Sequence, residues 1–416
     1  MMSRFIILAV FFMAGTILAN NTASAGDARV LTGLDRLVKS DFELFKGKRV
    51  GLITNATGVD YKLNSIVDLF YDAENVDLVA LFGPEHGVRG DYTAGEYVES
   101  YTDERTGLPV YSLYGTTRKP GPEMLEGLDV LVYDIQDVGA RSYTYISTMG
   151  LAMEAAAEKG IQFIVLDRPN PLGGRKIEGN IVEEGYFSFV SQFPVPYVYG
   201  LTSGELARMI NGEGWLNNGK KVDLYIMPMT GWNRDMTFEE TGLEWVPTSP
   251  HIPHRDSAIY YTATGILGEL YYINIGVGYT TPFQTFAAEW IDSYELSTRM
   301  NALELDGVIF RPVTYRPYYG TDEGKIVHGV QVHITDYRKV NLISLQYHFL
   351  EIHHELYPDK NPFEHAVNRH TMFDRVSGTS KVRELFTERM KYEDIEEFLN
   401  KDVESFRETS KKYFLY

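Results

Sequence analysis

Glu85 and His86 are adjacent residues that can both transfer protons, and glycines surround them in LFGPEHGVRG, residues 81–90. A carboxylic acid can protonate a leaving oxygen, and an imidazole exchanges a proton near neutral pH. Glycine lets the backbone turn sharply and lets a ligand approach closely. The apolar run that ends at Gly83 predicts a buried strand, so this pair follows a strand end. The stretch is therefore either a polar turn or part of a site.

Polar side chains also follow other predicted strands of the same sheet. Helical patterns separate the apolar runs, which is typical of a parallel sheet covered by helices. These runs lie at 48–58, 76–87, 128–139, 161–171 and 221–229. Ligands bind such sheets outside the carboxyl ends of the strands. Besides Glu85 and His86, the residues expected at this edge are Asn55, Asp134, Gln136, Asp137, Arg141, Asp167, Arg168 and Asn170.

Carboxyl groups at this edge fit the hydrolysis of glycosidic bonds. One carboxylic acid protonates the leaving oxygen, while a second carboxylate or the substrate's own 2-acetamido group reacts at the anomeric carbon. The carboxyl groups on offer are those of Glu85, Asp134, Asp137 and Asp167. Arg141 and Arg168 either bind a carboxylate on the substrate or neutralise these acids structurally.

Other chemistries are less favoured. The sequence lacks the motifs of serine hydrolases with a nucleophile elbow, of zinc proteases, of P-loop proteins and of dinucleotide-binding proteins. It contains no cysteine, and its histidine pairs have poor spacing for metal ligands. We therefore expect neither a metal nor a cofactor. The net charge of −18 disfavours binding to nucleic acid.

Two domains are expected from the length and the pattern. The alternation of strands and helices stops near residue 255, and a mixed pattern follows. Its predicted strands span 307–318 and 326–336, and its predicted helices span 343–356 and 395–414. The predicted fold is an α/β domain with a parallel sheet, residues 26–255, and a smaller α+β domain, residues 256–416.

The first 25 residues have the features of a secretory signal peptide. Arg4 precedes an apolar run, residues 5–18, and Ala23-Ser24-Ala25 resembles a cleavage site. No other stretch approaches the roughly 20 apolar residues of a membrane span. We therefore expect residues 1–25 to be removed and the protein to be exported, either to the periplasm or to the medium.

Several motifs together resemble those of the NamZ-type exo-β-N-acetylmuramidase family. They are FGPEHGVRG, YDIQDVGARSYTYISTM, LDRPNPLGG, VYGLTSGELARMINGE, GVQVHITD and KKYFLY, and they extend from about residue 30 to 416. The resemblance implies a Rossmann-like first domain, a smaller C-terminal domain and a cleft between the two. It also implies removal of terminal N-acetylmuramic acid (MurNAc) from peptidoglycan fragments, with Glu85 as the leading catalytic candidate. His86, Asp134 and Asp167 are further catalytic candidates, and the other residues at the sheet edge are candidates for substrate binding.

One stretch departs from the family pattern. Many members carry E-G-T-N, then G-R-G-T and P-F-E, whereas residues 270–284 read LYYINIGVGYTTPFQ. Asn274 remains, but Tyr279 stands near the position of the family's arginine. We include both as candidates for substrate binding, and the change indicates that the sugar preferred here can differ. The alternatives are a metal-independent carbohydrate hydrolase or deacylase of another specificity and a non-catalytic glycan-binding protein.

Overall fold

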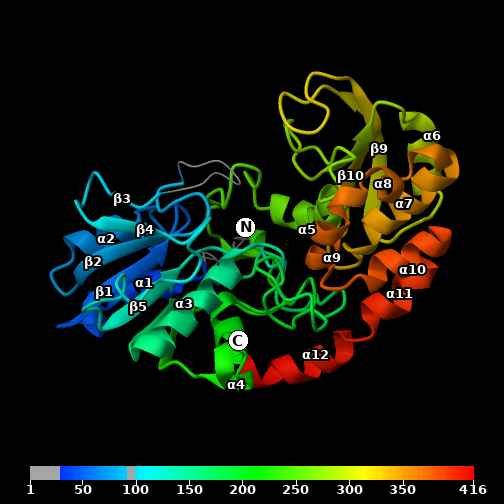
Figure 1. The fold of residues 1–416 in the computed structure, drawn as a ribbon. Helices are drawn as coiled ribbons and strands as arrows, with labels where there is room; N and C mark the ends of the chain where they lie inside the picture. The colour runs from blue at the N-terminus through cyan, green and yellow to red at the C-terminus, as the bar shows by residue number, and fades with distance from the viewer. Residues whose placement is uncertain (1–28, 91–98) are drawn as a thin grey trace, which may run out of the picture.

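The computed structural model describes residues 29–90 and 99–416. The chain forms an α/β unit and a smaller unit with its own sheet and helices (Figure 1). This arrangement confirms the predicted fold class. The proposed signal peptide, residues 1–25, lies outside the described residues, and the domain boundary at 255 stays a prediction.

A seven-stranded sheet with the order β3-β4-β2-β1-β5-β6-β7 forms the first unit. Its strands are β1 (Arg49–Thr54), β2 (Asp77–Gly83), β3 (Tyr101–Thr102), β4 (Pro109–Ser112), β5 (Val130–Asp134), β6 (Gln162–Leu166) and β7 (Leu224–Met227). The neighbours are parallel except β3 and β4, which are antiparallel. The chain moves outward from β1 in both directions, which opens a crevice at the carboxyl ends of β1 and β5.

Helices cover both faces of this sheet. The core on one face contains α1 (Gly33–Lys39) and α2 (Ile66–Asp72), and the core on the other contains α3 (Tyr145–Lys159) and α4 (Ser203–Glu213). The ends of two of these helices follow from the local sequence. Thr202 and Glu205 form a capping box at the start of α4, and Gly160 adopts a left-handed conformation with φ 77° after α3.

The second unit has a three-stranded antiparallel sheet with the order β8-β10-β9. Its strands are β8 (Thr285–Ala288), β9 (Val308–Tyr315) and β10 (Val327–Ile334). Its helices are α5 (Ser257–Gly268), α6 (Ser293–Asn301), α7 (Ser344–Leu356), α8 (Pro362–His365), α9 (His370–Ser377), α10 (Lys381–Arg389) and α11 (Glu393–Asn400). Short 3-10 helices span Glu43–Phe45, Asn217–Gly219, Glu239–Thr241, Pro358–Lys360, Val367–Arg369 and Lys411–Tyr413.

The C-terminal segment returns to the first unit. The single helix predicted over 395–414 is wrong, because the chain breaks into α11, α12 (Val403–Ser410) and a 3-10 turn. Helix α12 runs back toward α4 (Figure 1), and Phe406 is buried in the same core as α3 and α4. Arg208 of α4 then donates hydrogen bonds to the carbonyls of Tyr413 and Phe414. No helix in the described part of the chain is long and apolar enough to cross a membrane.

Candidate active site

The turn after β2 holds Glu85 and His86 in an unusual backbone conformation. His86 has a φ of 76° and Gly87 a φ of 73°, and the Gly87 amide donates to the carbonyl of Pro84 at 3.0 Å. A positive φ is uncommon for a residue with a side chain and often marks a functional site. His86 is buried in this turn, whereas Glu85 is only half-buried.

The Glu85 carboxylate has neighbours from two other segments of the first unit. The Thr144 hydroxyl, at the start of α3, donates to Glu85 Oε2 at 3.4 Å. Tyr114 follows β4, and its hydroxyl hydrogen bonds with Glu85. Burial, together with the Glu85 charge, raises the pKa of Tyr114 to about 12. Tyr114 therefore keeps its proton at neutral pH and can donate it in this hydrogen bond.

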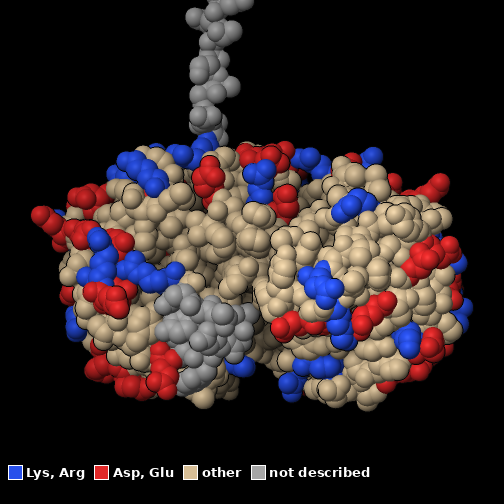
Figure 2. All heavy atoms as spheres, turned by 90° about the horizontal axis from the view of Figure 1, so that it is seen from above, with Lys and Arg blue, Asp and Glu red and all other residues tan. Residues whose placement is uncertain are grey.

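His251, near the end of the first unit, and tyrosines of the second unit complete the surroundings of this turn. Burial lowers the pKa of His251, and the nearby His86 imidazole adds to that effect. His251 in turn hydrogen bonds with the Tyr319 hydroxyl at 2.9 Å, and the two rings are stacked. Tyr271 lies close enough to Tyr114 to influence its ionisation. The Glu85 turn thus lies where the two units meet, and Figure 2 shows the surface hollowed between them.

Two tyrosines at the start of α3 pack beside this region. Tyr143 and Tyr145 pack edge to face, with ring centroids 4.9 Å apart. Both hydroxyls bind the Thr248 residue, Tyr143 at its Oγ1 (2.9 Å) and Tyr145 at its carbonyl. Burial raises the pKa of each tyrosine, and the Glu85 charge contributes to both shifts. Tyr145 also hydrogen bonds with Asn55, so the predicted residue after β1 lies beside this cluster.

Asp134 and Arg168 form a buried ion pair within the sheet edge. Arg168 Nε and Nη2 donate to the two Asp134 oxygens at 2.5 and 2.8 Å, and Nη2 also donates to the Val59 carbonyl at 2.9 Å. Asp134 is fully buried, which raises its pKa, while Arg168 opposes the shift. Both carboxylate oxygens are therefore occupied. This geometry argues against the catalytic role expected for Asp134 and favours a structural one.

Asp167 is likewise enclosed by hydrogen-bond donors. Its Oδ1 accepts from the Gly204 and Arg168 amides at 2.8 and 3.1 Å. Its Oδ2 accepts from the Thr202 and Tyr416 hydroxyls at 2.7 and 2.8 Å. Burial raises the pKa of Asp167 to about 7, although these donors favour the charged form. Asp167 joins α4 to the C-terminal segment, which again differs from the catalytic role expected.

Arg141 does not have the geometry of a substrate clamp. It is 1% exposed, and it donates to the carbonyls of Asn180, Val195 and Val376 at 2.7, 2.8 and 3.0 Å. Val376 belongs to α9, so this buried cation joins the two units. This enclosure by backbone carbonyls argues against the expectation that Arg141 binds a substrate carboxylate, which stays a prediction.

One of the two Asp137 carboxylate oxygens accepts hydrogen bonds. Oδ2 accepts from the Gly139 amide at 2.7 Å and from the Tyr199 hydroxyl. Oδ1 is buried and has no hydrogen-bond partner among the described residues. Burial raises the pKa of Asp137 to about 6.

The predicted amide side chains mainly support loops. Asn55 Oδ1 accepts from the Thr57 amide and hydroxyl at 3.0 and 2.6 Å. Asn170 binds the Leu201 carbonyl and the Leu172 amide, both at 2.9 Å. Gln136 Nε2 donates to the Asp137 and Pro169 carbonyls, both at 2.8 Å. These contacts stabilise the loops that follow the strands.

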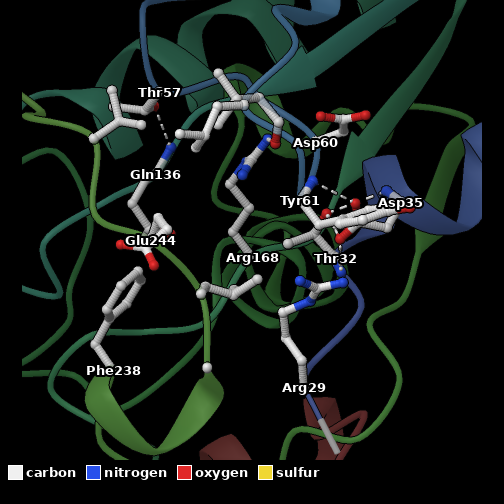
Figure 3. Close-up of a pocket in the computed structure, with 15 residues that line it drawn as sticks. Arg29, Thr32, Asp35, Thr57, Asp60, Tyr61, Gln136, Arg168, Phe238 and Glu244 are labelled. Atoms are coloured by element: carbon white, nitrogen blue, oxygen red, sulfur yellow. Dashed lines mark hydrogen bonds between the residues drawn. The ribbon is translucent and has the colours of Figure 1, made fainter. Parts of the chain in front are cut away.

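A separate pocket is lined in part by residues that follow β1, β5 and β6 (Figure 3). Gln136 and Arg168 line it together with Arg29, Asp35 and Glu244, whereas Glu85 is not part of its lining. Its volume of about 150 Å³ is below the roughly 300–1,000 Å³ that small-molecule sites usually have. It is therefore small for a sugar fragment. In residues 29–90 and 99–416, no group of three or more His, Cys, Asp or Glu side chains is placed to hold a metal ion.

Comparison with known families accounts for nearly the whole described chain. Residues 50–256 match the family described as "Exo-beta-N-acetylmuramidase NamZ, N-terminal", and residues 259–416 match its C-terminal counterpart. The chain belongs to the NamZ family. This finding confirms the resemblance inferred from the motifs.

Relatives of the NamZ family extend the similarity to both chain ends. The chain is 43% identical to the peptidoglycan beta-N-acetylmuramidase NamZ of Bacillus subtilis (strain 168) over 418 residues, which is 99% of each chain. A solved DUF1343 family protein of Bacteroides fragilis has 56% identity and a TM-score of 0.90, with 94% of this chain and 99% of that one covered. A second such protein of the same organism has 28% identity and a TM-score of 0.75, with 93% and 99% covered.

The stretch that departs from the NamZ pattern lies in the second unit. Asn274 is buried, and it binds the Gly276 amide, the Tyr315 hydroxyl and the Thr321 carbonyl at 2.6–2.8 Å. Tyr279 is half-buried and stacks on Tyr315 with ring centroids 4.7 Å apart. Asn274 therefore holds the loop in place rather than offering its amide to a sugar. Tyr279 stays a candidate for substrate binding.

Sequence reasoning missed several neighbours of Glu85 in this member of the NamZ family. They are Tyr114, Thr144 and His251. Tyr114 follows β4, a strand that is absent from the predicted set. The alternation in PVYSLYG, residues 109–115, is the signal that indicates this strand and its polar end. His251 has no such signal, because its proximity to His86 is a tertiary contact between residues distant in sequence.

Proposed function

We propose that this chain is an exo-acting glycosidase that releases terminal MurNAc from peptidoglycan fragments. The observation that carries this function is the 43% identity over 99% of both chains to a peptidoglycan beta-N-acetylmuramidase. The site supports it, because the half-buried Glu85 carboxyl group follows a strand end where residues of both units come close. MurNAc as the preferred sugar is the finer part of the proposal.

Glu85 is proposed as the general acid. Its carboxylic acid gives a proton to the glycosidic oxygen as the bond to the anomeric carbon breaks, and the remaining sugar chain leaves as an alcohol. The Tyr114 and Thr144 hydroxyls orient the carboxyl group through hydrogen bonds. His86 stays a candidate for proton transfer because it follows Glu85 in the same turn.

The group that reacts at the anomeric carbon is not Asp134 or Asp167 in this proposal. Their four oxygens already accept hydrogen bonds in the buried sheet edge. The 2-acetamido group of the substrate can take this role, as in glycosidases with substrate assistance. We favour that route. Glu85 first gives its proton to the leaving oxygen, and its carboxylate then accepts a proton from the water that completes hydrolysis.

Hydrolysis of aryl β-glycosides tests the function. The unmutated protein should release the aryl group from the β-MurNAc glycoside with a higher kcat/KM than from the β-N-acetylglucosamine (GlcNAc) glycoside. Equal values, or a preference for GlcNAc, would contradict the MurNAc assignment and leave a glycosidase of another specificity. Binding of both sugars without turnover would support a glycan-binding protein instead. Activity should also survive dialysis against a chelator, since the proposal contains no metal.

Export is part of this proposal because peptidoglycan lies outside the cytoplasm. Residues 1–25 have the sequence features of a signal peptide. The protein recovered from the periplasm or medium of an expressing bacterium should begin near Gly26. Mass spectrometry of the N-terminus reads this directly, and retention of residues 1–25 in a cell-associated protein would contradict it.

A further inference from the structure

We propose that Arg118 binds the lactyl carboxylate that distinguishes MurNAc from GlcNAc. This inference rests on the proposed function and assigns the residue that determines its specificity. The lactyl group is attached to the same sugar ring that contains the anomeric carbon. A cation that recognises it must therefore lie beside the general acid.

Arg118 lies beside Glu85 through a shared neighbour. The chain leaves β4 at Ser112, places Tyr114 against Glu85, and reaches Arg118 within the same loop. The Glu85 and Arg118 charges act in opposite directions on the pKa of the Tyr114 hydroxyl. Arg118 thus places a positive charge near the Tyr114 hydroxyl, which in turn lies beside the carboxyl group proposed as the acid.

The guanidinium of Arg118 is held in place without being neutralised. Its central carbon lies 4.3 Å from the centroid of the Phe189 ring, which is a cation–π contact. No ion pair or hydrogen bond engages the Arg118 side chain anywhere in residues 29–90 and 99–416. The side chain is exposed, so its N–H groups are open to a ligand. A planar guanidinium with open N–H groups suits bidentate binding of a carboxylate.

Other arginines of the site region are already engaged. Arg141 is enclosed by three carbonyls, and Arg168 is paired with Asp134. Arg369 stacks on Tyr271 at 4.2 Å, but its Nη2 is bonded to Glu269 Oε2 at 3.0 Å and its Nε to the Glu269 carbonyl. A substrate carboxylate at Arg369 would have to compete with Glu269. Arg118 has no such competitor in the described structure.

A pair of matched substrates tests this role. One is the aryl β-MurNAc glycoside, and the other is the same glycoside with its lactyl carboxylate converted to an amide. We expect the unmutated protein to prefer the carboxylate by roughly 10- to 150-fold in kcat/KM, as for a hydrogen bond to a charged group. Arg118→Met should lose this preference through KM, and Arg118→Lys should restore part of it. Arg369→Met is the control and should keep the preference.

The outcomes separate this inference from the proposed function. If the unmutated protein hydrolyses the MurNAc glycoside and Arg118→Met keeps its preference for the carboxylate, then Arg118 does not bind the lactyl group. The proposed function is unaffected by that result. If Arg369→Met loses the preference instead, the clamp is Arg369. If the unmutated protein hydrolyses neither substrate, the function itself fails. Equal melting temperatures of the variants show that folding is not the cause.

Discussion

Carboxyl groups of the same sheet edge differ in what already binds them. Asp134 and Asp167 accept hydrogen bonds on both oxygens and are fully buried, whereas Glu85 is half-buried beside two hydroxyls. An acid that protonates a substrate must contact it, which a carboxylate bound by buried donors cannot do. Asp137 is buried as well, although only one of its oxygens accepts hydrogen bonds. Burial and hydrogen bonding thus favour Glu85 over the three aspartates as the acid.

Replacing Glu85 by Gln should lower kcat on an activated aryl glycoside by about 10²–10⁴-fold, because the amide keeps the shape and has no acidic proton. Glu126→Gln, at an exposed site, should leave kcat unchanged. The measurement is the initial rate at saturating substrate, with the melting temperature as the check on folding. Near-normal activity of a folded Glu85→Gln protein would exclude Glu85 as the general acid.

Asp137 should make stability depend on pH. Burial raises its pKa from 3.8 to about 6, so the folded state binds a proton more tightly than the unfolded state. Its charge therefore lowers the free energy of unfolding progressively between about pH 4 and pH 6, by about 3 kcal/mol at most. Asp137→Asn removes this cost and keeps an oxygen for Tyr199 and Gly139. Relative to the unmutated protein, the variant should gain stability as pH rises from 4 to 7 in urea titrations, and a constant difference would contradict the shift.

At the scale of elements, strand ends could be predicted from the sequence, but their contacts could not. Apolar runs and the parallel pattern place Glu85, Asp134 and Asp167 at one edge, and the structure confirms these strands. Which side chain faces solvent depends on partners distant in sequence, such as Tyr416 for Asp167 or Val376 for Arg141. No local pattern contains that information, and this is why the sequence leaves two roles open for Arg141 and Arg168 and includes Asp134 and Asp167 among the catalytic candidates.

The capping box of α4 should contribute measurably to stability. Thr202 accepts from the Glu205 amide at 3.2 Å and donates to Asp167 at 2.7 Å. Thr202→Ala removes the cap and one donor to a buried carboxylate, so the free energy of unfolding should fall by about 1–3 kcal/mol. Thr202→Ser keeps the hydroxyl and is the matched control. Chemical denaturation of both variants measures the difference, and equal losses would show that the hydroxyl is not responsible.

At the scale of the whole molecule, Arg141 holds the two units together. Arg141→Met leaves three buried carbonyls without their donor, and each such group costs about 1–3 kcal/mol. We expect a loss of at least about 2 kcal/mol in the free energy of unfolding. Arg175→Met, at an exposed ion pair, should change it little.

The same Arg141→Met protein tests whether Arg141 has a structural role or binds the substrate. Its preference for the lactyl carboxylate over the amide should equal that of the unmutated protein at a temperature where both are folded. Loss of that preference with unchanged stability would restore Arg141 as a substrate ligand. The ratio of the two kcat/KM values reads this outcome independently of the amount of active protein.

The contact between Tyr416 and Asp167 has a consequence for how the chain is made. The two residues are 249 positions apart, yet the Tyr416 hydroxyl supplies one of the donors that Asp167 needs in its buried site. The first unit emerges from the ribosome long before Tyr416 is added. Asp167 therefore lacks the Tyr416 hydroxyl as a hydrogen-bond donor while synthesis continues. The first unit therefore reaches its final stability only after the second has been synthesised, and a chain crossing a membrane unfolded would meet the same delay on the far side.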